Sequence, residues 1–295
     1  GCPDWPGCYG HMIAPLTNFA EKSVTRAWTE MIHRYFVGGL SILIMTMIVL
    51  IFTQKKIRTG FNVSIALFLI ALLGYQIMLG QWTVTLKLLP VIVSQHLLGG
   101  YFILSSLWLI YLKNTTTVSL KRNMSAVKLM PWGICALLLL LMQIILGAWT
   151  STNYASLSCS GFPFCIDDQV MIWHWREAFN IFSPVGVNYD GGVLPDVVRQ
   201  TIQMAHRLGA LIVTTYLVLF IALASLQLKN RPDLSKLLYI VSGLLCVQIC
   251  LGISNVIFKL PLHVALAHTL AAALLFVSLL TFVFRLIFDR RGALQ

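Results

Sequence analysis

The segment EMIHRYFVGG, residues 30–39, and the segment QMAHRLGALI, residues 203–212, each place a histidine and an arginine side by side at the start of an apolar run. The two runs extend to about residues 52 and 226. Each is long enough to cross a lipid bilayer, for which about 20 apolar residues suffice. The two segments therefore predict a duplicated membrane protein with one histidine at the same place in each half.

The rest of the chain has the composition of an integral membrane protein. Its mean hydropathy is +0.83 and 11% of its residues are charged, against roughly 25% in a soluble domain. Backbone groups in lipid must bond within their own segment, so we expect the apolar runs to be helices. We predict seven spans, at residues 31–52, 61–82, 91–112, 130–150, 200–226, 237–258 and 264–287.

The net charge of +11 lies mainly in short loops between the spans. This is the pattern of the positive-inside rule and not of a nucleic-acid-binding surface. One set of loops carries thirteen cations and the opposite set carries six. We expect the first set and the C-terminus to be cytoplasmic, and the cysteine-bearing N-terminus and the long loop 151–199 to lie on the outer side.

Further segments repeat in the same order along the chain. The repeated pairs are LLPVIVSQHLLGG (88–100) with KLPLHVALAHTLAAA (259–273), YQIMLG (75–80) with VQICLG (247–252), and Cys2 and Cys8 with Cys159 and Cys165. Both cysteine pairs are separated by six positions. Duplicated halves of this kind are common in membrane proteins.

The repeat divides the chain into an N-terminal half, residues 1–128, and a C-terminal half, residues 129–295, which includes the loop 151–199. In the C-terminal half the span 130–150 precedes the cysteine pair, whereas the N-terminal half starts with its cysteines. We therefore expect a further helix before Gly1 in the full chain. Eight helices would then form two pseudo-symmetric four-helix bundles.

Four histidines lie within about two turns of the start of a predicted span: His33, His96, His206 and His268. Ionisable groups inside a membrane are costly and usually functional. Two imidazoles on facing helices could ligate a haem iron axially, whereas zinc is a weaker fit because it needs about four ligands. Hydrogen bonds across helices are the alternative, but they leave the repetition unexplained.

The remaining histidines are weaker candidates. His263 is the main rival of His268 because it lies five residues earlier, and the repeat alignment favours His268. His11 and His174 are expected on the solvated surface. Glycines near the four histidines would leave room for a planar group or allow close helix packing; they are Gly38, Gly39, Gly99, Gly100 and Gly209.

Glu30 stands three residues before His33, so both share one helix face. The equivalent residue of the second half is Gln203. A carboxylate beside a haem could move protons or stabilise developing positive charge. A structural ion pair between Glu30 and Arg34 is the alternative. Arg34 and its equivalent Arg207 could instead neutralise the carboxylates of a haem.

The outer cysteines are expected to form the disulfides Cys2–Cys8 and Cys159–Cys165, since disulfides persist on that side of a membrane. A structural role is favoured for Cys159–Cys165. For Cys2–Cys8, a redox role through thiol exchange and a structural role are both left open. Three further cysteines fall inside spans and are expected to be small apolar fillers: Cys135, Cys246 and Cys250.

These motifs together make the chain resemble the haem A synthases over nearly its whole length. The segments that carry the resemblance are CPDWPGC (2–8), EMIHR, HLLGG, MAHRLGA and the loop AFNIFSPVGVNYDGGVLP (178–195), which is similar to the Gram-negative bacterial members. The resemblance implies eight helices in two four-helix bundles. It also implies an oxidoreductase that converts the C8 methyl group of haem O to the formyl group of haem A, with oxygen from water, for terminal oxidases.

The resemblance also implies roles for individual residues. They are His206 and His268 as ligands of a haem b cofactor, His33 and His96 as ligands of the substrate haem iron, Glu30 as a catalytic residue, and Cys2 and Cys8 as a redox-active pair. It implies a bacterial inner-membrane location, with haem O synthase and oxidase assembly factors as partners, and leaves a homo-oligomer open. Two alternatives stand beside it: an electron-carrying cytochrome with two bis-histidine haems, and a haem transporter or chaperone without chemistry.

Overall fold

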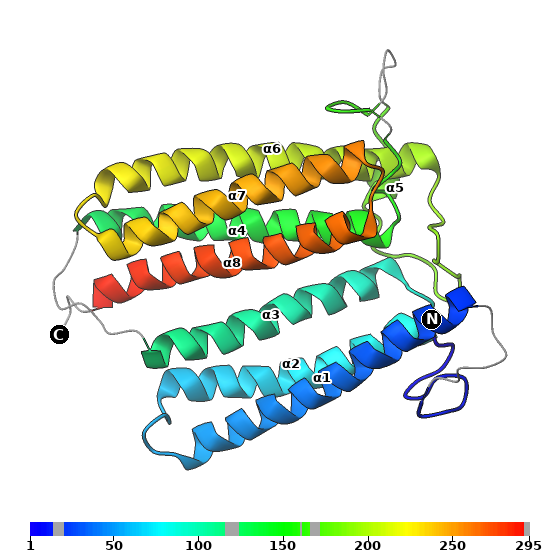
Figure 1. Cartoon of the computed structure of the whole chain (residues 1–295), viewed down its shortest axis with the longest axis horizontal. Helices are drawn as coiled ribbons and strands as arrows, with labels where there is room; N and C mark the ends of the chain where they lie inside the picture. Colours follow the sequence, from blue (N-terminus) through cyan, green and yellow to red (C-terminus); the bar gives the residue numbers. More distant parts are fainter. Residues whose placement is uncertain (14–20, 116–123, 160, 166–171, 292–295) are drawn as a thin grey trace. The chain divides into compact units, whose positions relative to one another are not determined.

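The computed structural model covers the 295-residue chain and describes all of it except residues 14–20, 116–123, 160, 166–171 and 292–295. The described residues form helices and no β-strand; a single isolated bridge joins Cys8 and His11. The helices are α1 (Glu21–Thr53), α2 (Gly60–Thr85), α3 (Pro90–Thr115), α4 (Met124–Thr152), α5 (Trp175–Ala178), α6 (Asp196–Gln227), α7 (Pro232–Ile257) and α8 (Leu262–Arg291) (Figure 1).

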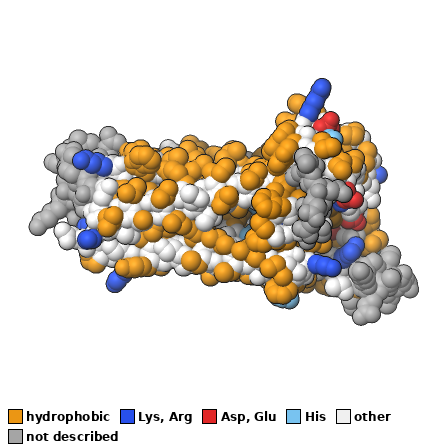
Figure 2. Space-filling view, turned by 90° about the horizontal axis from the view of Figure 1, so that it is seen from above, with side chains coloured by type: hydrophobic (Ala, Val, Ile, Leu, Met, Phe, Trp, Pro, Cys, Tyr) orange, Lys and Arg blue, Asp and Glu red, His pale blue; other side chains and the backbone are white. Residues whose placement is uncertain are grey.

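Seven of these helices, all except the four-residue α5, are long and apolar enough to cross a membrane. Figure 2 shows one face of the molecule, on which hydrophobic side chains predominate and lysine and arginine gather toward the two ends. An apolar surface of this kind suits lipid as the solvent. The predicted all-α, multi-pass membrane fold with seven spans is thus confirmed for the described chain.

Four helices, α1, α4, α6 and α7, begin four to ten residues earlier than the predicted spans. Helix α1 begins at Glu21 and α6 at Asp196, so His33 and His206 lie about three turns from the start of their helices and not within two. His96 and His268 lie within two turns of the starts of α3 and α8, as predicted. The reason for the difference is that hydropathy detects only the apolar part of a helix, whereas α1 and α6 continue into polar turns beyond it.

The described chain divides into two compact units. Unit 1 comprises Gly1–Ile110 and Phe182–Asp190, and unit 2 comprises Tyr111–Ile181 and Gly191–Gln295. Residues Phe182–Asp190, which lie in the long loop, belong to unit 1. Within this segment Tyr189 is buried, and its backbone N–H donates to the carbonyl of Lys87 at 3.1 Å. The division of the sequence into residues 1–128 and 129–295 remains a prediction about domain boundaries.

Unit 2 is a four-helix bundle in which α4 and α7 each pack against α6 and α8 (Figure 1). The rings of Phe220 and Phe282 meet edge to face in its core, with centroids 5.9 Å apart. A Cβ atom added at Gly133 of α4 would lie 3.2 Å from Val283 of α8. Because lipid tails are as apolar as leucine, such close approach between helices is what stabilises their packing.

In unit 1, α1 packs against α2. The shared core consists of Ile44, Ile48 and Ile51 from α1, Ala66, Leu69 and Leu73 from α2, and Ile110 from α3. The spacing of the three isoleucines puts them on one face of α1. Phe36 and Leu43 lie elsewhere on α1 and are 76% and 68% exposed, as expected for side chains that can face lipid.

The turn between α2 and α3 and the turn between α7 and α8 have the same backbone. Lys87 and Leu88 in the first turn, and Lys259 and Leu260 in the second, have φ between 51° and 63°. Both leucines donate their N–H to the carbonyl five residues earlier, at 2.9 and 2.8 Å. Left-handed backbone is uncommon for residues other than glycine. Its presence at both equivalent pairs confirms that the sequence repeat is also a structural repeat.

Candidate functional site

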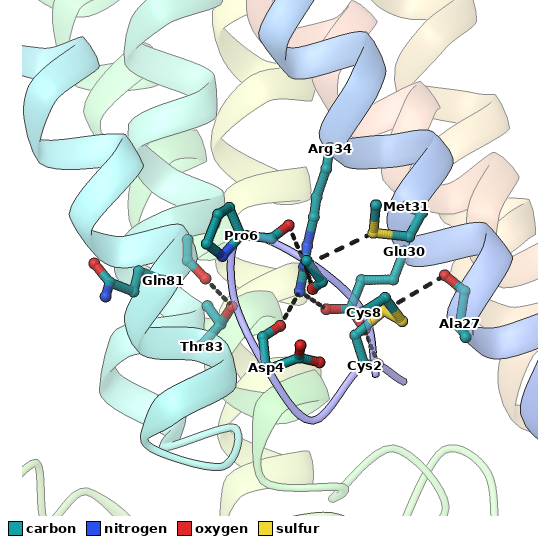
Figure 3. Close-up of polar contacts among 12 residues, drawn as sticks. Cys2, Asp4, Pro6, Cys8, Ala27, Glu30, Met31, Arg34, Gln81 and Thr83 are labelled. Carbon is teal, nitrogen blue, oxygen red and sulfur yellow. Dashed lines mark hydrogen bonds and ion pairs between the residues drawn. A yellow bond between two sulfur atoms is a disulfide. The ribbon is translucent and has the colours of Figure 1, made fainter. Parts of the chain in front are cut away.

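The first disulfide loop, residues 1–13, lies against the N-terminal part of α1 (Figure 3). Cys2 and Cys8 form the predicted disulfide, with Cα atoms 4.9 Å apart. Both cysteines are buried in a cluster with Ala27 and Met31 of α1. The Cys2 Sγ lies 3.8 Å from the carbonyl oxygen of Ala27. The disulfide is therefore docked on the helix that carries the predicted acid and histidine.

Arg34 fastens this loop to α1. Its guanidinium donates to three backbone carbonyls of the loop, those of Asp4 at 3.1 Å, Pro6 at 3.0 Å and Gly7 at 2.6 Å. Its side chain is only 15% exposed, and hydrogen bonds from a charged donor are stronger than neutral ones. Both terminal nitrogens of Arg34 are thus used on the loop, which differs from the hypothesis that Arg34 neutralises a haem carboxylate.

Glu30 of α1 contacts both Arg34 and the first disulfide loop. Its Oε1 accepts from Arg34 Nη2 at 2.6 Å, and its Oε2 accepts from the backbone N–H of Cys2 at 2.8 Å. The structural ion pair that was the alternative for Glu30 is therefore formed. A carboxylate has about four lone-pair sites, and these contacts occupy two, so the group retains acceptor capacity. Its side chain is 27% exposed, which leaves it accessible.

Asp4 shapes the far side of the loop, a role that the sequence did not reveal. Its carboxylate accepts from the backbone N–H groups of Tyr9 at 2.6 Å and Gly10 at 2.8 Å. These hydrogen bonds, that from Gly10 first, lower the pKa of Asp4 below its ordinary value. Tyr9 and Gly10 both have positive φ, so the carboxylate stabilises a turn that ordinary backbone does not favour.

Unit 2 contains a second copy of this arrangement. Cys159 and Cys165 form the predicted disulfide, with Cα atoms 4.5 Å apart, and both are buried against Met204, the equivalent of Met31. The Cys159 Sγ lies 3.9 Å from the carbonyl oxygen of Gln200. Arg207 donates to the carbonyls of the second loop, those of Gly161 at 2.8 Å, Pro163 at 3.1 Å and Phe164 at 3.3 Å.

The two copies differ in their acid. Gln203 stands where unit 1 has Glu30, and it is buried. Its Oε1 has no hydrogen-bond partner among the described residues. Arg207 holds its loop without a carboxylate, so the arginine does not require one. Glu30 is therefore an addition to a common frame of disulfide, methionine, histidine and arginine.

The structure brings the predicted histidines together within each unit. In unit 1, His33 is exposed on α1, His96 is half-buried on α3, and the two are close enough to interact electrostatically. In unit 2, half-buried His206 on α6 and half-buried His268 on α8 interact in the same way. Each unit thus presents one histidine pair from two helices.

The other histidines lie apart from these pairs. His263 and His11 are exposed, whereas His174 is half-buried and its backbone N–H donates to Thr201 at 3.1 Å. No group of three or more histidine, cysteine, aspartate and glutamate residues suited to a metal ion occurs in the described part of the chain. That finding does not bear on an axial haem pair, which needs only two histidines.

A glutamine and a glycine on the neighbouring helix accompany three of the four histidines. The segments are QIMLG (76–80) on α2 facing His96, QIILG (143–147) on α4 facing His206, and QICLG (248–252) on α7 facing His268. A Cβ atom added at the glycine would lie 3.5, 3.2 and 3.2 Å from the Cε1 of these histidines. Sequence reasoning matched the first and third segments but missed the second, although Q-I-x-L-G occurs three times.

The glycines singled out from the sequence have other surroundings. No atom lies within 4 Å of a Cβ placed at Gly38, Gly39 or Gly100, whereas Gly99 faces Gln76 and Gly209 faces Gln143. The room beside the imidazoles comes from Gly80, Gly147 and Gly252 on the neighbouring helices. The sequence left open whether the glycines near the histidines make room for a planar group or allow close helix packing. The approach of Gly99 and Gly209 to a neighbouring helix fits the second alternative, and the glycines that border the rings were not among those singled out.

Known proteins share this organisation. The sequence profile of the cytochrome oxidase assembly protein family, COX15-CtaA, matches residues 1–280. A haem A synthase from Shewanella oneidensis is 38% identical over 292 residues, which are 95% of this chain and 86% of that protein. The chain belongs to the haem A synthase family. Haem A synthases of Bacillus pumilus and Allorhizobium ampelinum are each 26% identical, over 94% and 86% of this chain and 82% and 68% of theirs.

Membership in the haem A synthase family confirms the resemblance drawn from the sequence and the predicted enzyme class, an oxidoreductase. One sequence interpretation was wrong. Cys135, Cys246 and Cys250 do lie in helices, but they are exposed and do not fill the core. An exposed cysteine in an apolar helix can face lipid, and hydropathy cannot distinguish such a position from a buried one.

Proposed function

We propose that this chain oxidises the C8 methyl group of haem O to the formyl group of haem A. The methyl group and one water molecule then yield a formyl group, four protons and four electrons, so the new oxygen comes from water. The observation that carries the proposal is the position of Glu30. It supplies an acid beside a histidine pair in one unit, whereas the matching position of the other unit holds Gln203.

Unit 1 is the proposed substrate site. His33 and His96 would ligate the iron of the substrate haem, and Glu30, three residues before His33 on α1, would receive protons from the reacting carbon or from water. The contacts from Arg34 and the Cys2 N–H hold its carboxylate in place and leave lone pairs for a proton. The exposure of His33 on α1 supports access of a lipid-soluble substrate.

Unit 2 is the proposed site of a haem b cofactor held by His206 and His268. The residues fit a haem, because Gly147 and Gly252 keep the ring edges of both histidines clear. The buried Nδ1 of His268 also has no partner among the described residues. When bound, a bis-histidine haem supplies one-electron transfer between ferric and ferrous iron. His268 is preferred over His263, which is exposed and lies at the start of α8.

The Cys2–Cys8 disulfide is a proposed acceptor for electrons from the substrate. It can take two electrons and two protons to become a dithiol, so the four-electron oxidation would proceed as two successive two-electron steps, with the dithiol reoxidised by thiol–disulfide exchange between them. Its contact with the helix that bears Glu30 supports this role. The equivalent Cys159–Cys165 disulfide lies against a unit without the acid, and we assign it a structural role.

The enzyme is proposed to lie in a bacterial inner membrane with both disulfide loops on the outer side, because the loops at the other helix ends carry most of the cations. A membrane-bound haem O synthase would be the natural supplier of the substrate. Oxidase assembly factors are the proposed recipients of the product, in keeping with the family description.

The test is analysis of the haems in purified wild type and variants by absorption spectroscopy and mass spectrometry. Glu30→Gln and Glu30→Ala are expected to lower haem A formation at least about 100-fold, as for removal of a catalytic proton acceptor. Gln203→Ala, at the equivalent place in unit 2, is the matched control and should retain haem A formation. His206→Ala should lose haem b, whereas His33→Ala should keep haem b and make no haem A.

Other outcomes would favour the alternatives. Stable haem in both units with no haem A under turnover conditions would indicate an electron-carrying cytochrome. Normal haem A levels in both Glu30 variants would remove the acid from the reaction, and a transporter or chaperone would then have to be considered.

A further inference from the structure

The three Q-I-x-L-G segments do not contact their histidines in the same way. Gln143 of α4 places its Nε2 3.0 Å from the Nδ1 of His206 and 2.9 Å from the His206 carbonyl oxygen. Gln248 of α7 places its Nε2 3.2 Å from the other ring nitrogen, Nε2, of His268. In the segment on α2, neither the Nε2 of Gln76 nor the Nδ1 of His96 has a hydrogen-bond partner among the described residues. Of these three glutamines, Gln143 alone therefore engages Nδ1 of its histidine.

The other side of the Gln143 amide lies against Gly209 of α6. Its Oε1 is buried without a hydrogen-bond partner among the described residues. A Cβ atom at Gly209, one turn after His206 in α6, would collide with that oxygen. Gly209 thus allows the amide to enter the space between α4 and α6. The motif, its glycine and a second glycine on the facing helix together place a polar group against a single ring nitrogen.

A histidine that binds a metal through one ring nitrogen usually donates the N–H of the other to an acceptor. That contact fixes the tautomer and the rotation of the ring. A glutamine amide can serve either tautomer, because a rotation exchanges its NH₂ donor and its carbonyl acceptor. The His206 carbonyl does not depend on Gln143, since it lies within α6 and can accept an intrahelical bond.

We propose that Gln143 is the positioning residue for His206: it donates to Nδ1 in the haem-free protein and accepts from Nδ1–H when Nε2 ligates iron. This inference rests on the proposed haem b site of unit 2. It assigns Gln143 no contact with the iron or with substrate, so its effect is transmitted entirely through the His206 ring.

The experiment titrates the purified, haem-depleted full chain with ferric haem b and then records the electron paramagnetic resonance spectrum and the midpoint potential. Gln143→Leu removes both polar groups and should weaken haem b binding about 10- to 100-fold, the usual effect of losing such a partner. Gln143→Glu keeps an acceptor; it should retain haem b and shift the midpoint potential downward, because a carboxylate makes the imidazole a stronger donor to iron.

Two controls separate this effect from general loss of packing. Gln76→Leu alters the same motif position in unit 1 and should leave the haem b spectrum and potential unchanged. Gly209→Ala keeps the amide but displaces it, and should shift the spectrum in the same direction as Gln143→Leu.

The proposal is overturned if Gln143→Leu has wild-type haem b affinity, spectrum and potential, or, should that variant not fold, if Gln143→Glu and Gly209→Ala both match wild type. Failure of the underlying haem b assignment has a different result, because His206→Ala would then bind haem b normally.

Discussion

Replacement of Arg34 by alanine tests whether the arginine holds the first disulfide loop on α1. Arg34 makes three hydrogen bonds to loop carbonyls and an ion pair with Glu30. A hydrogen bond from a charged donor contributes about 1.5–3 kcal/mol. The freed carbonyls can reach water because the loop surface is exposed, so the loss is less than the sum. We expect docking of the loop to weaken by about 2–4 kcal/mol.

This weakening should be measurable as faster reduction of the disulfide. Cys2 is 7% exposed and Cys8 is fully buried, so a water-soluble phosphine can reach the sulfurs only when the loop opens. Since 1.4 kcal/mol corresponds to a factor of ten, the open population should rise roughly 30- to 1,000-fold. The assay follows reduction by trapping free thiols with an alkylating reagent and identifying the modified cysteines by mass spectrometry.

The matched control is Arg207→Ala, which should accelerate reduction of Cys159–Cys165 and leave Cys2–Cys8 at the wild-type rate. Arg34→Lys should have an intermediate effect, because an ammonium lacks the planar fork of a guanidinium. If Cys2–Cys8 in Arg34→Ala is reduced at a rate within twofold of wild type, the hydrogen bonds from Arg34 contribute little to docking of the loop, and the disulfide is protected by its apolar contacts instead.

Three further outcomes follow from single contacts. The pKa of Asp4 lies below 3.8 in the folded loop, so the ionised carboxylate stabilises the loop fully above that pH, and this stabilisation is lost as the pH falls through the lowered pKa. Reduction of Cys2–Cys8 by the phosphine should therefore accelerate in strong acid in wild type but not in Asp4→Asn. Gly252→Ala places a Cβ atom 3.2 Å from the Cε1 of His268 and should weaken haem binding by about 1–3 kcal/mol in titrations. Gly80→Ala places its Cβ atom 3.5 Å from the Cε1 of His96 and should have little effect on haem binding. Gly192 has φ +83° and would approach the Asn153 carbonyl oxygen to 3.1 Å as alanine, so thermal unfolding should show a loss of about 1–3 kcal/mol.

The comparison of the two units explains why one acid matters. Both units use a buried disulfide, a methionine beneath it and an arginine that binds loop carbonyls. The same frame therefore supports a carboxylate in unit 1 and an amide in unit 2. A site can change its chemistry in this way without changing its fold, because the second disulfide loop keeps its arginine contacts where Gln203 replaces the acid.

Several features could be predicted because they depend on the chain alone. The seven spans follow from the need to place apolar residues and internally bonded backbone in lipid. The duplication was evident from the shared segments around His33 and His206, and the cysteine pairs from their equal spacing. Glu30 stood out for the same reason, because the second copy has Gln203 in place of this acid.

Other features depended on the packing of separate helices. Sequence placed Arg34 beside Glu30 but could not show that its guanidinium reaches across to three loop carbonyls. It likewise could not pair Gln143 with His206, 63 residues away. In a membrane helix nearly every face is apolar, so periodicity does not reveal which side meets a neighbour. The amino-acid sequence therefore determined the spans, the repeat and the residue types at the site, whereas only the tertiary structure decided which polar group each long side chain reaches.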